Sequence, residues 1–264
     1  MKYAIIGSGN LAWHLAGVLG RQAVVIYREQ QPVESWPVDL LPLEAVATQN
    51  WDALFLAVPD EAIRAVSQQL AAVLPADLPV IHTSGATPLD RIDAQFRHRG
   101  VLWPIRSLRK GEIVADWNDL PLVLQADTQL ARRRLTEIAG DLSQTVTWLN
   151  DRQRAQLHLA AVFSNNFVTA LYEVAFQLCA SCDVPFDLLL PIIRNTAGRQ
   201  DGSRPADRQT GAAARGDYAT MDRHLELIDR ETYQNLYRDI SALILEYRLP
   251  QHDTDFRGEP DDDL

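Results

Sequence analysis

A glycine-rich turn directly follows the first apolar strand of this chain. The segment Tyr3–Ile6 runs into Gly7-Ser8-Gly9-Asn10-Leu11-Ala12, which has the spacing G-x-G-x-x-A. In this pattern the first glycine permits a tight turn, the second lets the backbone approach a pyrophosphate, and the small last residue lets the next helix pack on the strand. The order strand, turn and helix predicts a dinucleotide-binding site at residues 7–12, with the phosphates at a helix N-terminus. A ligand-free strand-to-helix turn is the alternative.

The first 150 residues alternate short apolar segments with helical segments. Runs this short and this apolar are typical of strands that are buried on both faces of a parallel sheet. We therefore predict an α/β domain over residues 1–150 with a doubly wound, Rossmann-like parallel sheet. The predicted strands are Tyr3–Ile6, Ala23–Tyr27, Ala53–Val58, Val80–Thr83, Val101–Trp103, Leu122–Gln125 and Thr145–Leu149.

From Asp151 onward the short apolar segments give way to long helical segments, and residues 151–264 are predicted to form an all-helical domain. Residues 151–180 form one long helical segment that is apolar around most of its circumference, including Phe163, Phe167 and Phe176. A helix that is apolar all round is buried. We therefore expect this helix to pack within its own domain and against a second subunit, which predicts a homodimer. Residues 198–217 are polar and irregular, as expected of a functional or disordered loop.

The bulk composition narrows the class of partner and the compartment. The formal net charge is −10, which disfavours nucleic acid and anionic membrane surfaces as partners. The tail from about residue 250 holds six acidic residues and one arginine, and it is expected to be a solvated end. No uninterrupted apolar run reaches the roughly 18 residues of a membrane helix. With no visible N-terminal signal and only two cysteines, the expected location is the cytoplasm.

The end of the second predicted strand bears on the choice of cofactor. An acidic residue at this position binds the ribose 2′-hydroxyl of NAD, whereas an arginine nearby accommodates the 2′-phosphate of NADP. Here the strand ends in Tyr27 and Arg28, and Glu29 follows. We expect Tyr27 and Arg28 to contact the cofactor and prefer NADP, because Arg28 can pair with a phosphate. Glu29 leaves NAD open, and a plain surface role for Arg28 is the other reading.

Further site residues are expected where other strands end. Ligands of open α/β sheets lie outside the carboxyl ends of the strands. Val58 and Pro59 follow the third predicted strand, and His82, Thr83 and Ser84 close the fourth. We assign Val58, Pro59, His82 and Thr83 to the cofactor and Ser84 to positioning in catalysis. A histidine that closes a strand is also commonly a hydrogen-bonded structural residue.

Polar residues interrupt the long apolar helix. His158, Asn165, Thr169 and Tyr172 recur at spacings of 7, 4 and 3, which predicts one shared face. Buried polar groups need partners, so this stripe faces either a ligand or an internal polar network. In the first case His158 is the general acid and Asn165 orients the substrate.

Two more residues are assigned to a substrate, Arg215 and Asn166. Arg215 can clamp a carboxylate with two hydrogen bonds, although Gly216 and Asp217 beside it are also ordinary turn and helix-start signals. The histidines have no partner at metal-ligand spacing, so no metal site is predicted.

Several of these segments together resemble known reductases. Tyr3–Ile6 with residues 7–12 is similar to the start of pyrroline-carboxylate reductases and deazaflavin-dependent NADP reductases. A narrower resemblance, to bacterial Rossmann-like proteins with a helical C-terminal domain of unknown function, rests on four segments and extends to about residue 248. These are Val58-Pro59-Asp60, His82–Gly85, Leu157–Asn166 and Thr210–Asp217 followed by His224-Leu225.

The resemblance implies NADP binding and the dimeric helical domain of the 6-phosphogluconate dehydrogenase superfamily. Two departures affect the site: many members have His-Pro at Trp103-Pro104, and many have Thr-Gly-Pro at residues 210–212. Hydroxyacid dehydrogenases of the superfamily use a lysine on the first long helix of the second domain. This chain has His158 in that region, and its only lysines are Lys2 and Lys110. A lysine-dependent hydroxyacid dehydrogenase is therefore disfavoured.

Taken together, these features predict an NADP-dependent oxidoreductase. It would transfer a hydride to or from a small metabolite in a cleft between the two domains, with His158 as acid or base. The alternatives are a non-catalytic NADP(H)-binding sensor or scaffold and a protein with a vestigial nucleotide site.

Overall fold

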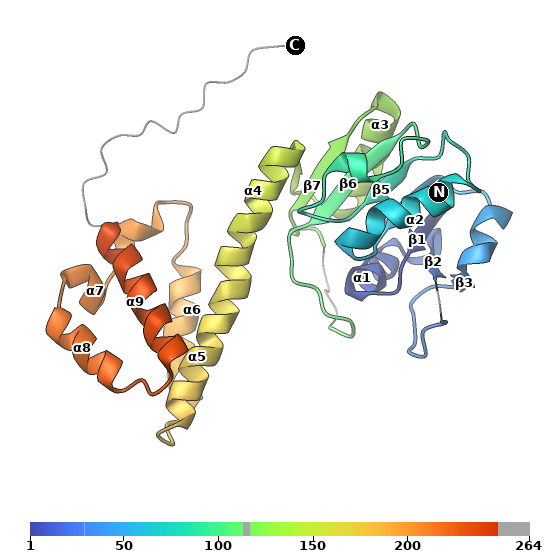
Figure 1. The fold of residues 1–264 in the computed structure, drawn as a ribbon. Helices are drawn as coiled ribbons and strands as arrows, with labels where there is room; N and C mark the ends of the chain where they lie inside the picture. The colour runs from blue at the N-terminus through green and yellow to red at the C-terminus, as the bar shows by residue number, and fades with distance from the viewer. Residues whose placement is uncertain (29, 113–116, 248–264) are drawn as a thin grey trace, which may run out of the picture. The chain divides into compact units, whose positions relative to one another are not determined.

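The computed structural model describes residues 1–28, 30–112 and 117–247 (Figure 1). The predicted acidic tail and Glu29 lie outside the described residues. The chain divides into two compact units, the first covering residues 1–166 and the second beginning at Phe167. The first unit therefore extends 16 residues past the predicted boundary at residue 150, since it includes the start of the long helix.

The first unit contains an eight-stranded sheet in the order β3-β2-β1-β4-β5-β6-β7-β8. All neighbouring strands are parallel except β6 and β7, which are antiparallel. The predicted α/β, doubly wound class is confirmed, but the expectation of a fully parallel sheet is wrong at this pair. The strands are β1 (Tyr3–Ile6), β2 (Ala23–Tyr27), β3 (Leu40–Pro42), β4 (Ala53–Leu56), β5 (Val80–His82), β6 (Arg99–Pro104), β7 (Leu122–Ala126) and β8 (Val146–Trp148).

The antiparallel pair has a simple geometric cause. Parallel strands need a crossover that returns the chain to the same end of the sheet, usually a helix. No helix lies in the described part of the connection between Pro104 and Leu122. Strand β7 therefore starts beside the end of β6, at the edge of the sheet where β1, β4 and β5 also end.

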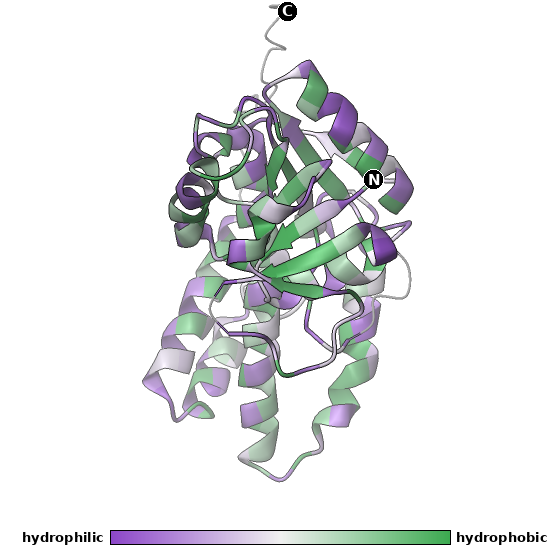
Figure 2. Ribbon diagram, turned by 90° about the vertical axis from the view of Figure 1, so that its right-hand side faces the viewer, coloured by the Kyte–Doolittle hydropathy of each residue, from purple (hydrophilic) through white to green (hydrophobic). Residues whose placement is uncertain are grey.

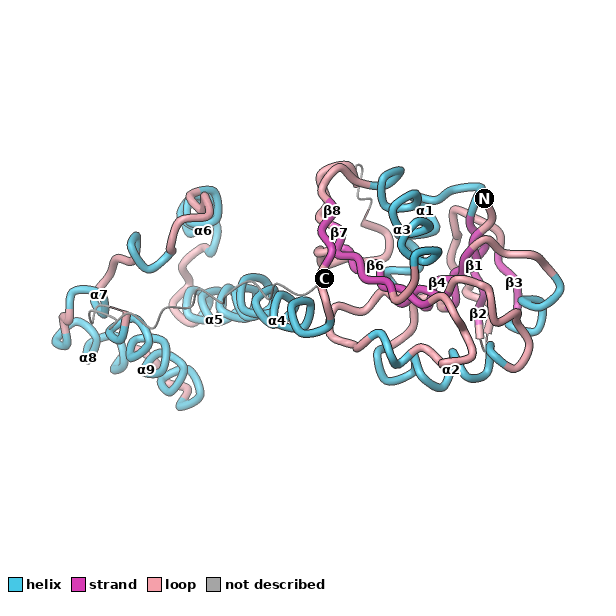
Figure 3. The backbone as a smooth tube through the Cα atoms, turned by 90° about the horizontal axis from the view of Figure 1, so that it is seen from above, coloured by secondary structure: helices cyan, strands magenta, loops and turns pink. Residues whose placement is uncertain are grey.

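Helices cover both faces of the sheet, with α1 and α3 on one face and α2 on the other (Figure 3). Alternate residues of each strand feed the two cores: Tyr3 and Ile5 pack with α1 and α3, whereas Ala4 and Ile6 pack with α2. The strands are accordingly apolar along their length (Figure 2). The helices of this unit are α1 (Asn10–Leu19), α2 (Ile63–Ala71), α3 (Gln129–Leu142) and α4 (Asp151–Ala161).

The long helical segment is not one regular helix. A π-helical segment, η5 (Val162–Phe167), separates α4 from α5 (Val168–Ala180). The π-helix has a wider turn than the α-helix, so it breaks the repeat from which a common face for His158 and Asn165 was predicted. That part of the prediction is wrong, because the spacing was counted along an uninterrupted α-helix.

The second unit is all-helical, as predicted. Helix α7 packs against α8 and α9. No residue of α5 is buried within the chain, and Phe167, Phe176 and Leu171 are exposed. The prediction of burial is thus wrong for the single chain. Besides α5, the helices are α6 (Leu190–Gly198), α7 (Ala212–Arg215), α8 (Tyr218–Glu226) and α9 (Glu231–Glu246).

One helical stretch, Asp151–Ala180, is long and apolar enough to cross a membrane by length and composition alone. A core helix of a globular protein passes the same test. None of the apolar window of this stretch is buried in the structure, whereas Arg154 near its start is fully buried in the first unit and binds polar groups there.

Candidate functional site

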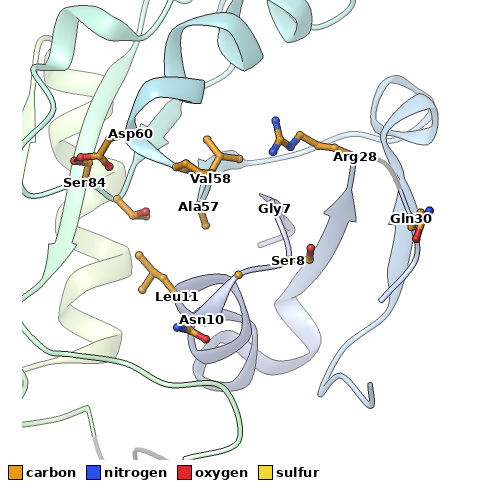
Figure 4. Close-up of a pocket in the computed structure, with 13 residues that line it drawn as sticks. Gly7, Ser8, Asn10, Leu11, Arg28, Gln30, Ala57, Val58, Asp60 and Ser84 are labelled. Atoms are coloured by element: carbon orange, nitrogen blue, oxygen red, sulfur yellow. Dashed lines mark hydrogen bonds between the residues drawn. The ribbon is translucent and has the colours of Figure 1, made fainter. Parts of the chain in front are cut away.

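A cavity of about 730 Å³ opens in the first unit where β1, β2, β4 and β5 end (Figure 4). It extends from Arg28 and Gln30 at one end to Asp60 and Ser84 at the other. This is the edge of an open α/β sheet at which ligands bind. The cavity is lined by Gly7, Ser8, Gly9, Asn10, Leu11, Arg28, Gln30, Ala57, Val58, Pro59, Asp60, Thr83 and Ser84.

The turn at Gly7 holds β1 between its two neighbouring strands. The Gly7 amide donates to the carbonyl of Ile26 at 3.0 Å, and the backbone has φ +118°, which only glycine adopts readily. A Cβ at this position would lie 2.3 Å from the carbonyl oxygen of Ala57. Gly7 is therefore required by the packing of the strands themselves, before any ligand is considered.

Gly9 differs from Gly7, because a Cβ there would meet no atom within 4 Å. Gly9 is the N-cap of α1, and no side chain caps that helix end. The first amides of α1 consequently face the cavity without a side-chain acceptor, and a helix N-terminus of this kind binds phosphate. Ala12 lies behind the loop, fully buried against the sheet, where its small side chain permits close packing.

Arg28 and Gln30 form the end of the cavity beside β2. Arg28 directly follows the last residue of that strand, Tyr27, which is partly buried and does not line the cavity. An arginine at this place suits the 2′-phosphate of NADP.

At the opposite end, Ser84 is held in a network of hydrogen bonds. Its hydroxyl lies 2.8 Å from a carboxylate oxygen of Asp60 and 3.0 Å from Oγ1 of Thr87, and it accepts the amides of Ala86 and Thr87. Thr83 is buried and donates to the carbonyl of Leu56 at 3.3 Å. Both hydroxyls are thus fixed by the fold, and the Asp60 carboxylate adds a hydrogen-bond acceptor at this end of the cavity.

His82 is fully buried and does not line the cavity. Burial, and after it the positive charge of Arg154, lowers the pKa of His82 to about 3, while the charge of Asp151 acts in the opposite direction. Its Nδ1 accepts the amide of Ser84 at 3.2 Å, so the neutral ring carries its proton on Nε2. His82 is therefore neutral at physiological pH and supports the Ser84 turn from behind.

His158 lies beside this same turn. Its ring packs edge-on against Trp103 with the centroids 5.5 Å apart, and its buried Nδ1 has no hydrogen-bond partner in the described part of the chain. A Cβ on Gly85 would lie 2.8 Å from that Nδ1 and 2.5 Å from the indole of Trp103. The absence of a side chain at Gly85 therefore lets His158 approach the backbone next to Ser84, although His158 itself does not line the cavity.

Arg154 anchors α4 to the sheet one turn before His158. Its guanidinium is bonded to the side chain of Gln125 on β7, to the carbonyl of Thr87 and, at 2.7 Å, to Asp151. Asp151 in turn accepts the amide of Leu89 at 3.0 Å. These bonds pair the two terminal nitrogens of the buried guanidinium, whereas its Nε has no hydrogen-bond partner among the described residues. This cluster fixes the position of His158 relative to the Ser84 turn.

The other residues assigned to substrate or catalysis lie elsewhere. The amide nitrogen of the Asn165 side chain donates to Oγ of Ser107 at 2.7 Å, and Asn165 and Asn166 are both exposed. Arg215 belongs to the second unit, at the end of α7, where its guanidinium lies 3.8 Å from Asp217.

Four residues at or beside the cavity were not among the assigned site residues: Gln30, Ala57, Asp60 and Lys110. Ala57 and Asp60 flank the assigned Val58 and Pro59, so the rule for strand ends could have included them. Nothing in the sequence connects Lys110 with the glycine turn, yet its Nζ donates to the carbonyl of Ser8 at 2.9 Å. No group of three or more histidine, cysteine or acidic residues that could hold a metal occurs in residues 1–28, 30–112 and 117–247.

Comparison with known proteins gives a family match for the later part of the chain. Residues 120–244 match the family described as Domain of unknown function (DUF2520). No curated protein matches the sequence significantly. The match covers β7, β8 and the helical unit as far as residue 244, within α9. Together with the similar solved structures, it confirms the expected resemblance to Rossmann-like proteins with a helical C-terminal domain.

Solved structures extend the similarity to 93% of the chain. A Bacteroides fragilis protein provisionally named an NADP oxidoreductase is 29% identical, with TM-score 0.81 and coverage of 93% of this chain and 98% of that one. Protein TM1727 from Thermotoga maritima is 18% identical, with TM-score 0.68 and coverage of 93% and 97%. An Aspergillus terreus imine reductase, in complex with NADPH4 and dibenz[c,e]azepine, is 18% identical, with TM-score 0.61 and coverage of 93% and 92%. The last two similarities establish the fold.

Proposed function

We propose that this protein is an NADP-dependent oxidoreductase that reduces or oxidises a small metabolite. The observation that carries the proposal is the cavity at the strand ends, where the turn at Gly7 and Gly9 leads into an uncapped helix N-terminus. The open space beside Gly9 fits the close approach of a pyrophosphate. The fold shared with NADP-dependent reductases supports the same assignment.

NADP is preferred over NAD for two reasons. Arg28 offers a guanidinium at the end of β2, where the ribose 2′-position of a dinucleotide lies. The structure with 29% identity to this chain bears the name of an NADP oxidoreductase. The comparisons therefore support the NADP prediction, and a titration of the protein with both dinucleotides tests it directly.

In the proposed reaction, His158 exchanges the proton that accompanies hydride transfer. NADPH held by the residues that line the cavity would supply the hydride for reduction of a carbonyl or imine carbon of the substrate. His158 donates a proton to the carbonyl oxygen or imine nitrogen. In the reverse direction His158 accepts this proton and the oxidised cofactor accepts the hydride. The buried Nδ1 of His158 has no hydrogen-bond partner in the described residues and lies beside Gly85. The neighbouring Ser84 lines the end of the cavity away from Arg28, whereas His158 lies behind this lining. Asp60 and Ser84 supply polar contacts at that end.

His158→Asn is expected to abolish turnover and leave NADP affinity nearly unchanged. Asparagine keeps a polar group of similar reach but cannot donate a proton as imidazolium does. The measurement is NADPH consumption with a panel of cyclic imines and small ketones, together with the dissociation constant for NADP. His98→Asn is the matched control, because the His98 ring contacts Thr128 and Asp77 before the start of β6 and does not line the cavity. Full turnover in the His158 variant would remove this residue from the mechanism.

A non-catalytic NADP(H) sensor is the second candidate, and one observation favours it. The Ser84 hydroxyl is already hydrogen-bonded to Asp60 and Thr87, so it is not free to assist His158 in protonating a substrate. The sensor hypothesis predicts that NADPH binds but is not oxidised by any compound of the panel. Substrate-dependent oxidation would exclude it.

The helical unit is proposed to form a homodimer. Its single chain leaves large apolar side chains exposed, among them Phe176 (47%), Leu188 (69%) and Ile192 (62%). Such surfaces are typical of protein interfaces. We expect a dimer by light scattering at micromolar concentration, and we expect Leu188→Glu to shift it toward monomer; a wild-type monomer would contradict the proposal. A cytoplasmic location is part of the same proposal.

A further inference from the structure

Lys110 reaches the dinucleotide-binding turn from a loop 100 residues away in the sequence. Its amide donates to Oδ1 of Asn10 at 3.1 Å, and its ammonium donates to the carbonyl of Ser8 at 2.9 Å. The carbonyl of the preceding residue, Arg109, contacts Nε2 of His14 on α1 at 2.9 Å. Three contacts therefore hold this loop against the turn and α1. The antiparallel start of β7 keeps the loop at this edge of the sheet.

The ammonium of Lys110 lies beside the ribose end of the cavity, bonded to the lining residue Ser8, although Lys110 itself does not line the cavity. Ser8 follows Gly7, whose amide is bonded to Ile26 on β2, so Ser8 lies beside the end of that strand. Arg28 continues from the same strand and lines the cavity together with Ser8. In dinucleotide-binding folds, the group on the ribose 2′-position is recognised at the end of this strand.

The ammonium is held there by an acidic and an aromatic residue. Lys110 forms an ion pair with Glu34 and lies over the ring of Trp36, 5.0 Å from its centroid. The hydrogen bond from Lys110 is the main cause that holds the pKa of Glu34 below its usual value. Glu34 is therefore ionised at neutral pH, and a phosphate arriving at this end would compete with its carboxylate for the same ammonium.

We propose that Lys110 is a specificity-determining residue that, together with Arg28, selects NADP over NAD by binding the 2′-phosphate, and that Glu34 restrains this selectivity. The inference rests on the proposed NADP function. A second cation strengthens the binding of a phosphate dianion, because hydrogen bonds between charged groups are stronger than those between neutral groups. NAD has only a hydroxyl at this position and gains nothing comparable from the ammonium. Glu34 weakens phosphate binding in two ways: its carboxylate repels the phosphate, and it competes for the ammonium of Lys110.

The other lysine of the chain provides a matched control. Lys2 also contacts a polar side chain, Gln49, and an aromatic ring, Trp51 at 5.1 Å. It lies just before β1, at the end of the strand away from the glycine turn. Lys2→Gln and Lys110→Gln therefore remove the same charge from beside a polar side chain and a tryptophan ring, and only Lys110→Gln removes it from a site next to the cavity.

The experiment measures dissociation constants for NADP and NAD with the full chain. We expect Lys110→Gln to weaken NADP about tenfold and to change NAD less than about twofold. Lys110→Arg should restore most of the preference, Glu34→Gln should tighten NADP severalfold, and Lys2→Gln should match the wild type. Circular dichroism establishes that each variant is folded.

Two results would overturn the inference. Equal weakening of both dinucleotides in Lys110→Gln would mean that the lysine supports the turn or the pyrophosphate instead of the 2′-phosphate. An unchanged NADP-to-NAD ratio, with normal NADP binding, would mean that it has no part in selection. Failure of the wild type to bind NADP is a separate outcome, which would overturn the proposed function and this inference together.

Discussion

Gly7→Ala is expected to lower the free energy of unfolding by about 3–5 kcal/mol. The new Cβ would lie 2.3 Å from the carbonyl oxygen of Ala57, and alanine would have to adopt φ +118°. Neither problem can be relieved by a rotamer change, because both involve backbone that β1 shares with β2 and β4. Urea denaturation followed by circular dichroism gives the stability, and NADP affinity is expected to be lost with the turn.

Gly9→Ala is the matched control for that experiment. Gly9 has φ −82° and ψ −173°, which alanine adopts without strain, and a Cβ there meets nothing within 4 Å. We expect stability within about 1 kcal/mol of the wild type. NADP affinity should nevertheless fall strongly, because the methyl group occupies the space for the pyrophosphate. Normal NADP binding by Gly9→Ala would argue against a dinucleotide in this cavity, and a stable Gly7→Ala would argue against the packing described.

Arg154→Met is expected to destabilise the first unit by about 3 kcal/mol. Methionine fills most of the volume, but the carbonyl of Thr87 and the side chain of Gln125 lose their buried donor. Removing one partner of a buried ion pair is costly, and the partial exposure of Asp151 (42% of its side chain) moderates the loss. The measurement is again urea denaturation, with turnover as a second readout, since His158 lies one turn further along α4.

Arg152→Met controls for charge and helix propensity, because Arg152 lies on the same helix and is exposed. We expect this variant to differ from the wild type by less than about 0.5 kcal/mol. If both variants had the same stability, the hydrogen bonds of Arg154 would not be what fixes α4 to the sheet.

Much of the fold could be predicted because the first unit follows local rules. Seven of its strands coincide with the predicted short apolar segments, and their alternation with helices indicates the doubly wound class. Strand β3 was missed, since Leu40–Pro42 has three residues, ends in proline and lies at the sheet edge, where local patterns are weakest. The direction of β7 was also missed, because it depends on which end of the sheet a loop without a helix returns to.

The candidate site divides in the same way. The glycine turn and each strand end are short continuous segments of the sequence. Local patterns therefore identify the residues that line the cavity, among them Gly9, Arg28 and Ser84. His158 was assigned from a polar interruption in an apolar helix, but its position beside Gly85 and Trp103 depends on the buried Arg154 cluster. The prediction that Asn165 shares a face with His158 is wrong because a π-helical segment lies between α4 and α5. Counting residues at the α-helical repeat does not reveal such a segment.

The sequence by itself determined that a strand, a glycine turn and a helix form a nucleotide site at the N-terminus. The physical reason is local: Gly7 and Ala12 meet steric requirements within one turn of chain. The tertiary structure decided the remaining surroundings of that site. It placed His158 beside the Ser84 turn and Lys110 against the carbonyl of Ser8, because the packing of α4 and the reversal at β7 bring together residues separated by some 70 to 100 positions.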